Sequence, residues 1–305
     1  MNEISHRGTE VSLVAQLNKL ARHNRQGSFR TKDRYYQAMK RFCRYLAEYY
    51  HLQKLSNINA NHLVNYVLCL QEAGKSASTV KTDLAAIRFF HDKMDDPRHT
   101  LPSNGELGVA LERRRFGGVD RTWNNEEFNK LLGIALGEDR YDYILALYLA
   151  RYAGLRIHEC FRIDTAIAEQ TLRENAITIK GKGGKIRAVP INEQITLAMR
   201  KQLQRTVRGH KLLVPDDMPT DRAIYRLEAF ILTHREEIQQ QTPHAPLTFH
   251  GLRHTYAAEK YKELVERGMG ELDAHFAVSR LLGHERADVT NIYLSSVRKD
   301  GVHGE

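Results

Sequence analysis

Four short segments carry side chains that could together act on a phosphate group. They read AGLRIHE (153–159), KGKGGKIRAVP (180–190), FHGLRHTY (249–256) and LLGHERADVTNIYL (281–294). Between them they supply guanidinium, ammonium, imidazole and phenol groups. Attack on a phosphodiester loads negative charge onto its non-bridging oxygens, and a planar guanidinium binds two such oxygens at once. The residue types therefore indicate phosphoryl transfer at a phosphodiester.

Two arginines are the candidate clamps for that charge. Arg156 and Arg253 stand in the first and third segments. A preorganised donor to charge in a transition state is typically worth on the order of 3 kcal/mol, so loss of either arginine should slow the reaction about a hundredfold or more. Glu159 follows Arg156 by one helical turn, and its carboxylate can support that guanidinium without taking part in the chemistry.

The second segment predicts a β-hairpin with a basic turn. AITIK (176–180) and IRAVPI (186–191) have the pattern of strands, and the glycines between them permit a tight reversal. Lys182 lies in that turn. The basic residues around it are predicted to bind DNA, and they are Lys180, Lys185 and Arg187. As a charge cluster alone, the same stretch would suit a phosphate-binding hairpin without a catalytic role.

Two histidines are candidates for hydrogen bonds to the phosphate. His250 precedes Arg253 by three residues, so both project from one face of a helix. His284 follows Gly283, which can end a helix in the left-handed conformation and leave the imidazole at the helix terminus. His254 is adjacent to Arg253 and points elsewhere, so we predict a structural role for it.

Tyr293, nine residues after His284, is the candidate nucleophile. A phenol has a pKa near 10 and attacks weakly until nearby cations and a base favour its ionised form. The chain contains 14 tyrosines, so residue type alone does not select this one.

In this order the four segments resemble the catalytic domain of the tyrosine recombinases of the phage-integrase type. The family's pattern is an arginine in a GLR-x-x-E turn, a lysine in a β-hairpin, a His-x-x-Arg pair, and LGH with a tyrosine nine residues later. The motif resemblance covers about residues 123–294. For residues 1–118 the resemblance is architectural only, to the SAM-like core-binding domain with which the family clamps DNA.

The resemblance implies a role for each motif residue. Lys182 would protonate the leaving 5′-oxygen, a contribution commonly worth about 10²- to 10⁴-fold. His250 and His284 would hydrogen-bond the phosphate, and Tyr293 would attack it to give a 3′-phosphotyrosine. The implied catalytic set is Arg156, Lys182, His250, Arg253, His284 and Tyr293, with Glu159 in support.

The resemblance also implies partners and the absence of cofactors. The partners are double-stranded DNA at specific recombination sites, three further copies of the chain in a homotetramer on two duplexes, and accessory DNA-bending proteins. Strands would be exchanged through a Holliday junction. Because bond energy is kept in the phosphotyrosine, no metal, ATP or other cofactor is expected. Two features depart from the family pattern: the segment from Arg253 to His284 is several residues longer, and only 12 residues follow Tyr293.

The elements that must position these residues are predicted to be mostly helical. Apolar residues recur at spacings of three and four. The predicted helices span about 10–23, 30–50, 58–73, 78–94, 125–136, 139–152, 156–162, 192–206, 220–238, 250–267, 271–282 and 287–296. The predicted fold class is mostly α with a small β-sheet, namely an N-terminal helical bundle followed by a mixed α/β catalytic domain.

Pro, Gly and charged residues interrupt the helical pattern between about Asp95 and Trp123. We predict a linker there and two domains, a DNA-clamp domain of residues 1–118 including the linker and a catalytic domain of residues 119–305. Asn124 and Glu127 form a capping-box pattern that begins the second domain.

Charge favours a polyanionic partner, and the N-terminal part most of all. The net charge is +9; residues 1–118 hold 19 Lys/Arg and 11 Asp/Glu, or +8, and the remainder holds +1. Six basic residues on the second predicted helix are the predicted DNA-binding set of this part, with a solvated face as the alternative. They are Arg30, Lys32, Arg34, Lys40, Arg41 and Arg44.

Composition excludes several other classes of protein. No apolar run approaches the roughly 18 residues of a membrane span, and no apolar signal region begins the chain, so we expect a soluble cytoplasmic protein. The three cysteines, Cys43, Cys69 and Cys160, lie among apolar residues and form no CxxC pair or zinc-ligand pattern.

Two other functions use the same residues. A type IB topoisomerase shares the Tyr, Arg and Lys chemistry but relaxes supercoils without exchanging partners. A DNA-binding regulator with a decayed catalytic domain would bind sites without cleaving them. The filled motif positions and the LGH-to-Tyr spacing favour the recombinase.

Overall fold

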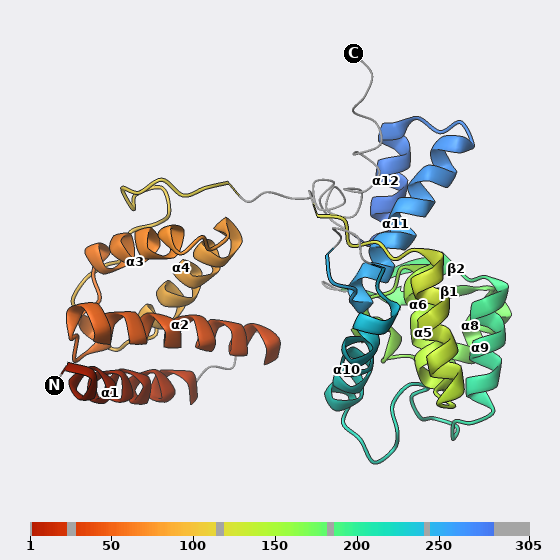
Figure 1. The fold of residues 1–305 in the computed structure, drawn as a ribbon, viewed down its shortest axis with the longest axis horizontal. Coiled ribbons are helices and arrows are strands. Elements are labelled where there is room, and N and C mark those ends of the chain that lie inside the picture. Colours follow the sequence, from red (N-terminus) through yellow and green to blue (C-terminus); the bar gives the residue numbers. More distant parts are fainter. Residues whose placement is uncertain (1, 23–28, 114–118, 182–185, 241–244, 284–305) are drawn as a thin grey trace. The chain divides into compact units, whose positions relative to one another are not determined.

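The chain divides into two compact units, residues 1–115 and 116–305, and each is described by itself (Figure 1). The computed structural model describes residues 2–22, 29–113, 119–181, 186–240 and 245–283, without the side chains of residues 2–5, 29 and 30. The predicted boundary near Gly118 falls outside these ranges and stays a proposal, as does the predicted helix at 287–296.

The N-terminal unit is built from helices. Its elements are α1 (Asn2–Arg22), α2 (Phe29–Tyr50), the 3-10 helix η1 (Leu55–Asn57), α3 (Ala60–Glu72) and α4 (Ala77–His91). On α2, the residues Met39, Phe42, Cys43 and Leu46 follow spacings of three and four and are fully buried. Because α2 packs against both α1 and α4, this stripe is the centre of the unit's core.

The segment after α4 packs onto the same core. Leu107 is buried there, and Leu101 and Leu111 are partly buried against the same cluster. The amide of Gln71 donates to the carbonyl oxygen of Ala110 at 2.8 Å, and Nε of Arg88 donates to that of Pro102 at 2.8 Å. The first half of the predicted linker is therefore attached to the N-terminal unit, because its apolar side chains cover the unit's core.

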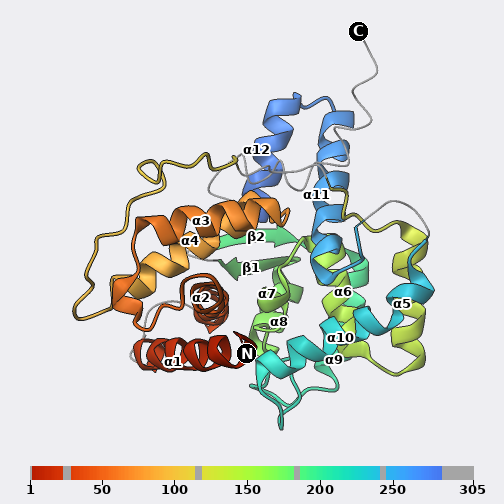
Figure 2. The ribbon, with the colours of Figure 1, turned by 60° about the vertical axis from the view of Figure 1, so that its left-hand side comes forward.

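The second unit is a helical domain with one β-hairpin (Figure 2). Its elements are α5 (Asn125–Gly137), α6 (Tyr141–Ala153), α7 (Ile157–Cys160), α8 (Thr165–Glu174), β1 (Ala176–Lys180), β2 (Ile186–Pro190), α9 (Glu193–Leu203), α10 (Thr220–Ile238), α11 (Phe249–Glu266) and α12 (Glu271–Leu282). The predicted fold class, mostly helical with a small sheet, is confirmed.

Helix α6 is the centre of this unit. Leu145, Leu149 and Ala153 are fully buried, as are residues on its other faces, because α5, α9 and α11 all pack against it. Its neighbour α5 begins with the predicted capping box: the side chain of Asn124 accepts from the amide of Glu127 at 2.8 Å, and Glu127 accepts from the amide of Asn124 at 2.9 Å.

The two strands are antiparallel and pair Ala176 with Pro190 and Lys180 with Ile186. Ile177 and Val189 are directly opposite each other and both are buried in the unit's core. Helix α8 packs on β1, and α12 contacts β2. The hairpin is thus fixed between two helices, one of which, α8, the sequence pattern did not predict.

None of the helices in the described ranges combines the length and the apolar composition needed to cross a membrane.

Candidate active site

The GLR-x-x-E segment forms a turn between two helices. Helix α6 ends at Gly154, which has φ +62°, and α7 begins after Arg156. The carboxylate of Glu159 accepts the backbone N–H of Arg156 at 2.8 Å and its Nη1 at 3.0 Å. One carboxylate therefore caps α7 and holds the guanidinium, which is the contact that the spacing predicts.

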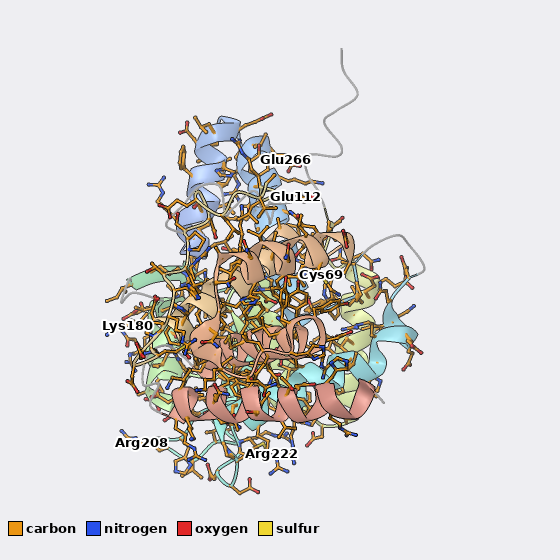
Figure 3. All side chains as sticks on the ribbon, turned by 90° about the vertical axis from the view of Figure 1, so that its left-hand side faces the viewer. Cys69, Glu112, Lys180, Arg208, Arg222 and Glu266 are labelled. Carbon is orange, nitrogen blue, oxygen red and sulfur yellow. The ribbon has the colours of Figure 1, made fainter. Side chains whose placement is uncertain are left out.

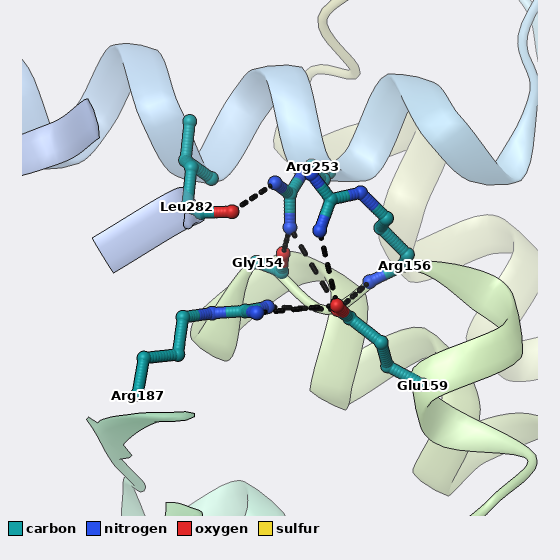
Figure 4. A network of polar contacts seen from close by, with 6 residues as sticks. All are labelled: Gly154, Arg156, Glu159, Arg187, Arg253 and Leu282. Carbon is teal, nitrogen blue, oxygen red and sulfur yellow. Dashed lines mark hydrogen bonds and ion pairs between the residues drawn. The ribbon is translucent and has the colours of Figure 1, made fainter. Parts of the chain in front are cut away.

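A third residue, Arg187 on β2, also binds the carboxylate of Glu159 (Figure 4). Its Nη1 donates to Oε1 of Glu159 at 3.1 Å and its Nη2 donates to Oε2 at 2.8 Å. Its side chain is 10% exposed and that of Glu159 is 1% exposed. The sequence grouped Arg187 with DNA-facing cations, whereas the structure places its guanidinium on a buried anion.

Strand register explains this placement. Arg187 pairs directly with Ile179, and directly opposed residues of an antiparallel pair point to the same face of the sheet. Ile179 is buried, so Arg187 also points to the buried face. The alternation of buried and exposed positions along AITIK and IRAVP therefore predicts that the Arg187 side chain points into the domain.

Arg253 approaches the same carboxylate from α11. Its Nη1 donates to the carbonyl of Gly154 and lies 3.9 Å from Oε2 of Glu159, and its Nη2 donates to the carbonyl of Leu282 at 2.6 Å. Arg253 is 0% exposed, whereas the side chain of Arg156 is 26% exposed. Arg253 thus joins the ends of α6 and α12 from within the domain, and Arg156 reaches solvent.

Among the described residues of the cluster, guanidiniums outnumber the one carboxylate. Burial alone would raise the pKa of Glu159, but hydrogen bonds and charge from Arg187 and Arg156 outweigh burial and lower it to about 2. Glu159 is therefore ionised at neutral pH. Among the described residues, three guanidiniums gather around the one carboxylate of Glu159, and such a grouping of guanidiniums suits the binding of an anion.

His250 lies at the start of α11 and is exposed. Desolvation lowers its pKa to about 4, together with the charges of Arg253, Arg156 and Arg121. His250 is therefore neutral at pH 7. Its ring meets that of His254 edge to face at 5.1 Å, and His254 is 1% exposed. No sequence pattern had indicated Arg121, whose nearby charge acts on both histidines.

Several predicted site residues lie outside the described ranges: Lys182, Lys185, His284 and Tyr293. Their proximity to the cluster stays a prediction. Lys180 ends β1 and is exposed (Figure 3). In the described ranges, no group of three or more His, Cys, Asp or Glu side chains is placed to hold a metal ion.

The predicted DNA-binding residues of α2 contact two different neighbouring helices. Arg34 donates to Oγ1 of Thr82 on α4 at 3.3 Å, and Arg41 pairs with the buried Asp83 of α4 at 2.7 Å. Arg44 instead lies 3.4 Å from Glu10 of α1. Lys32 is partly buried and Lys40 is exposed, and the side chain of Arg30 lies outside the description. Binding of DNA by these residues stays a prediction.

Comparison with protein families identifies the chain. Residues 122–299 match the phage integrase family, and residues 17–94 match the N-terminal SAM-like domain of phage integrases. The first match alone covers more than half of the sequence. The matched ranges are thus those of a DNA strand-transfer enzyme, and the chain belongs to the phage integrase family.

Related proteins support the same family. Tyrosine recombinase XerD of Halalkalibacterium halodurans is 25% identical over 278 residues, which cover 86% of this chain and 86% of the relative. Tyrosine recombinase XerC of Vibrio parahaemolyticus is 27% identical over 274 residues, which cover 87% and 82%. The predicted family is therefore confirmed, and the chain is a tyrosine recombinase, an enzyme of site-specific DNA recombination.

Solved structures share the fold. XerH recombinase in a post-cleavage complex with a palindromic difH substrate has a TM-score of 0.61 at 19% identity, with 94% of this chain and 83% of that chain covered. A lambda integrase dimer bound to a COC′ core site has a TM-score of 0.62 at 15% identity, with 95% and 78% covered.

Proposed function

We propose that the chain recombines double-stranded DNA at specific sites through a 3′-phosphotyrosine at Tyr293 and a Holliday junction. The observation that carries this proposal is the buried carboxylate of Glu159, which gathers guanidiniums from three separated segments into one anion-binding point. A cluster of guanidiniums suits the phosphate of a strand undergoing attack.

In each step of the proposed reaction, one phosphodiester bond forms while another breaks. The phenol oxygen of Tyr293 attacks phosphorus while the bond to the 5′-oxygen breaks, and Lys182 gives that oxygen a proton. The imidazole of His250 is neutral and so has an unprotonated nitrogen that can accept the proton of the phenol. A 5′-hydroxyl of the partner duplex then reverses the step, so no ATP is consumed.

The two clamp arginines differ in access. Arg156 is partly exposed and can meet a non-bridging oxygen directly. Arg253 is fully buried and donates to the carbonyls of Gly154 and Leu282. A phosphate reaches Arg253 only after this guanidinium becomes accessible, so we propose that DNA binding changes the surroundings of the α12 end.

A covalent-trapping experiment tests the proposal. The cleavage site is first recovered by sequencing recombination products from a library of DNA sites. A nicked suicide substrate of that site should then trap the wild-type protein, with unchanged yield in EDTA. Tyr293→Phe should form no covalent complex and retain DNA affinity, because only the attacking oxygen is removed. Trapping by the Phe variant would reassign the nucleophile, and no trapping by the wild type would favour a DNA-binding regulator.

The proposed assembly follows the relatives. A lambda integrase tetramer has been solved on a Holliday junction, with a TM-score of 0.61 to this chain. We propose four protomers on two duplexes, with accessory DNA-bending proteins as further partners. We also propose a cytoplasmic location, because the proposed substrate is DNA.

A further inference from the structure

Arg187 is the one member of the guanidinium cluster to which the proposed reaction gives no task. It comes from β2, one residue after the strand begins, and its side chain is 10% exposed. Both of its terminal nitrogens donate to Glu159. Because these donors are occupied inside the domain, a contact with the DNA backbone does not explain the residue.

Arg187 and Arg156 each donate two hydrogen bonds to the carboxylate of Glu159. Oε1 accepts from Nη1 of Arg156 at 3.0 Å and from Nη1 of Arg187 at 3.1 Å. Oε2 accepts from the backbone N–H of Arg156 at 2.8 Å and from Nη2 of Arg187 at 2.8 Å. Each oxygen therefore has one bond from each arginine, and a rotation of the carboxylate would break bonds to both (Figure 4).

Arg187 also touches the end of α12. A Cβ built on Gly283, which has φ +65°, would lie 3.1 Å from Nη1 and 3.3 Å from Cδ of Arg187. The neighbouring carbonyl of Leu282 accepts from Arg253. The Arg187 side chain thus packs where β2, α7 and the end of α12 meet, and a Cβ at residue 283 would require it to shift by a few tenths of an ångström.

We propose that Arg187 is a positioning residue for Arg156. It fixes the plane of the Glu159 carboxylate from the opposite side, so that Arg156 presents its guanidinium to the scissile phosphate in one orientation. This role rests on the proposed function. It requires the two-pronged geometry of a guanidinium, because an ammonium reaches only one oxygen well.

The test compares single-turnover cleavage of two suicide substrates by the full-length protein. One has a normal scissile phosphate, and the other has a neutral methylphosphonate that lacks the charge Arg156 neutralises. Arg187→Gln should cleave the phosphate about 10- to 100-fold more slowly, the range typical for loss of a supporting hydrogen bond. On the methylphosphonate its deficit relative to wild type should shrink to under about threefold, because positioned charge no longer matters.

Three further variants make the result specific. Arg187→Lys should fall between wild type and Arg187→Gln on the phosphate and show the same rescue, which keeps the test usable if the Gln variant folds poorly. Lys182→Ala should be slow on both substrates, since the leaving oxygen still needs a proton. Arg222→Gln, a matched change at an exposed position of α10, should cleave like wild type.

Two outcomes would overturn the proposal. Equal slowing of the Arg187 variants on both substrates would mean that the residue only maintains the fold. Weaker DNA affinity with an unchanged rate at saturating protein would make Arg187 a DNA contact. Failure of the wild type to form any covalent complex is a different result, and it would count against the proposed function itself.

Discussion

At the scale of single residues, the site depends on a backbone position that tolerates no side chain. Gly154 has φ +62°, and a Cβ there would lie 2.4 and 2.7 Å from ring atoms of Tyr256, which is buried. Its carbonyl also accepts from Arg253. Glycine therefore allows α6 to end where both the Tyr256 ring and the Arg253 guanidinium approach the chain.

Gly154→Ala should destabilise the catalytic unit by about 2 to 4 kcal/mol, from the left-handed strain and the overlap with the Tyr256 ring. Chemical unfolding followed by circular dichroism measures this change. Gly133→Ala is the matched control, because no atom lies within 4 Å of its Cβ position on α5 and alanine favours a helix there by up to about 1 kcal/mol. Equal stability of the two variants would contradict the contact with Tyr256.

Buried histidine makes stability depend on pH. Desolvation lowers the pKa of His254 to about 3, below its ordinary value of 6.5 in an unfolded chain. As pH falls below 6.5, the unfolded state takes up a proton that the folded state cannot, so the free energy of unfolding decreases. Glu159 contributes in a separate window, because its pKa is lowered from 4.5 to about 2 and its stabilisation is lost only below pH 4.5.

We therefore expect stability to fall between pH 7 and pH 5, with His254 responsible for about 1 to 2 kcal/mol of the loss. Urea unfolding at both pH values measures it. His254→Gln should reduce the difference between the two pH values by that amount, whatever its stability at pH 7. An unchanged difference would show that His254 is protonated in the folded protein.

At the scale of elements, the basic residues of α2 contact two different neighbouring helices. Arg34 and Arg41 contact α4, whereas Arg44 contacts Glu10 of α1. Arg34, Arg41 and Arg44 are spaced by seven and three and lie on one side of α2, but the helices packed beside that side divide their contacts. We propose that the face shared by α2 and α4 contacts the DNA backbone.

Arg34→Gln should reduce the slope of log affinity against log salt by about one, because one phosphate contact and its released counterion are lost. Arg44→Gln removes the same charge from the same helix and should change the slope less, since Glu10 already compensates that guanidinium. Fluorescence anisotropy over a series of salt concentrations measures both slopes. The reverse order would place the DNA on the α1 side.

Most elements and the contact between Arg156 and Glu159 could be predicted from the sequence, and the exceptions have physical reasons. The stripe on α2 and the GKGG turn between two alternating strands are local patterns. Helix α8 was missed because its ten residues run directly into β1 through Asn175, a non-glycine residue with φ 49° that ends the helix without a Gly or Pro signal. Arg187 was assigned to DNA because a charged residue in a basic turn predicts exposure, whereas a partner 28 positions earlier in the chain, Glu159, buries it.

At the scale of the whole molecule, the decisive property is exchange between duplexes. The chemistry at Tyr293 would serve equally for relaxation by a single protomer, so the cluster of Arg156, Arg187 and Arg253 cannot distinguish a recombinase from a type IB topoisomerase. The distinction depends on several protomers holding two sites at once. Strand exchange should therefore respond to protein concentration differently from cleavage.

The protein concentration is varied while the concentration of nicked DNA is held constant. Covalent trapping should saturate once each site is occupied. Junction formation should begin only at a higher protein concentration and rise more steeply, because it requires a filled assembly on two duplexes. Native gels of labelled DNA measure both products in one series. A supercoiled plasmid without the site is the control and should stay supercoiled. Relaxation of that plasmid at concentrations that yield no junctions would show that one protomer acts alone. This result would contradict the proposed strand exchange between duplexes, although it would remain compatible with the phosphotyrosine chemistry.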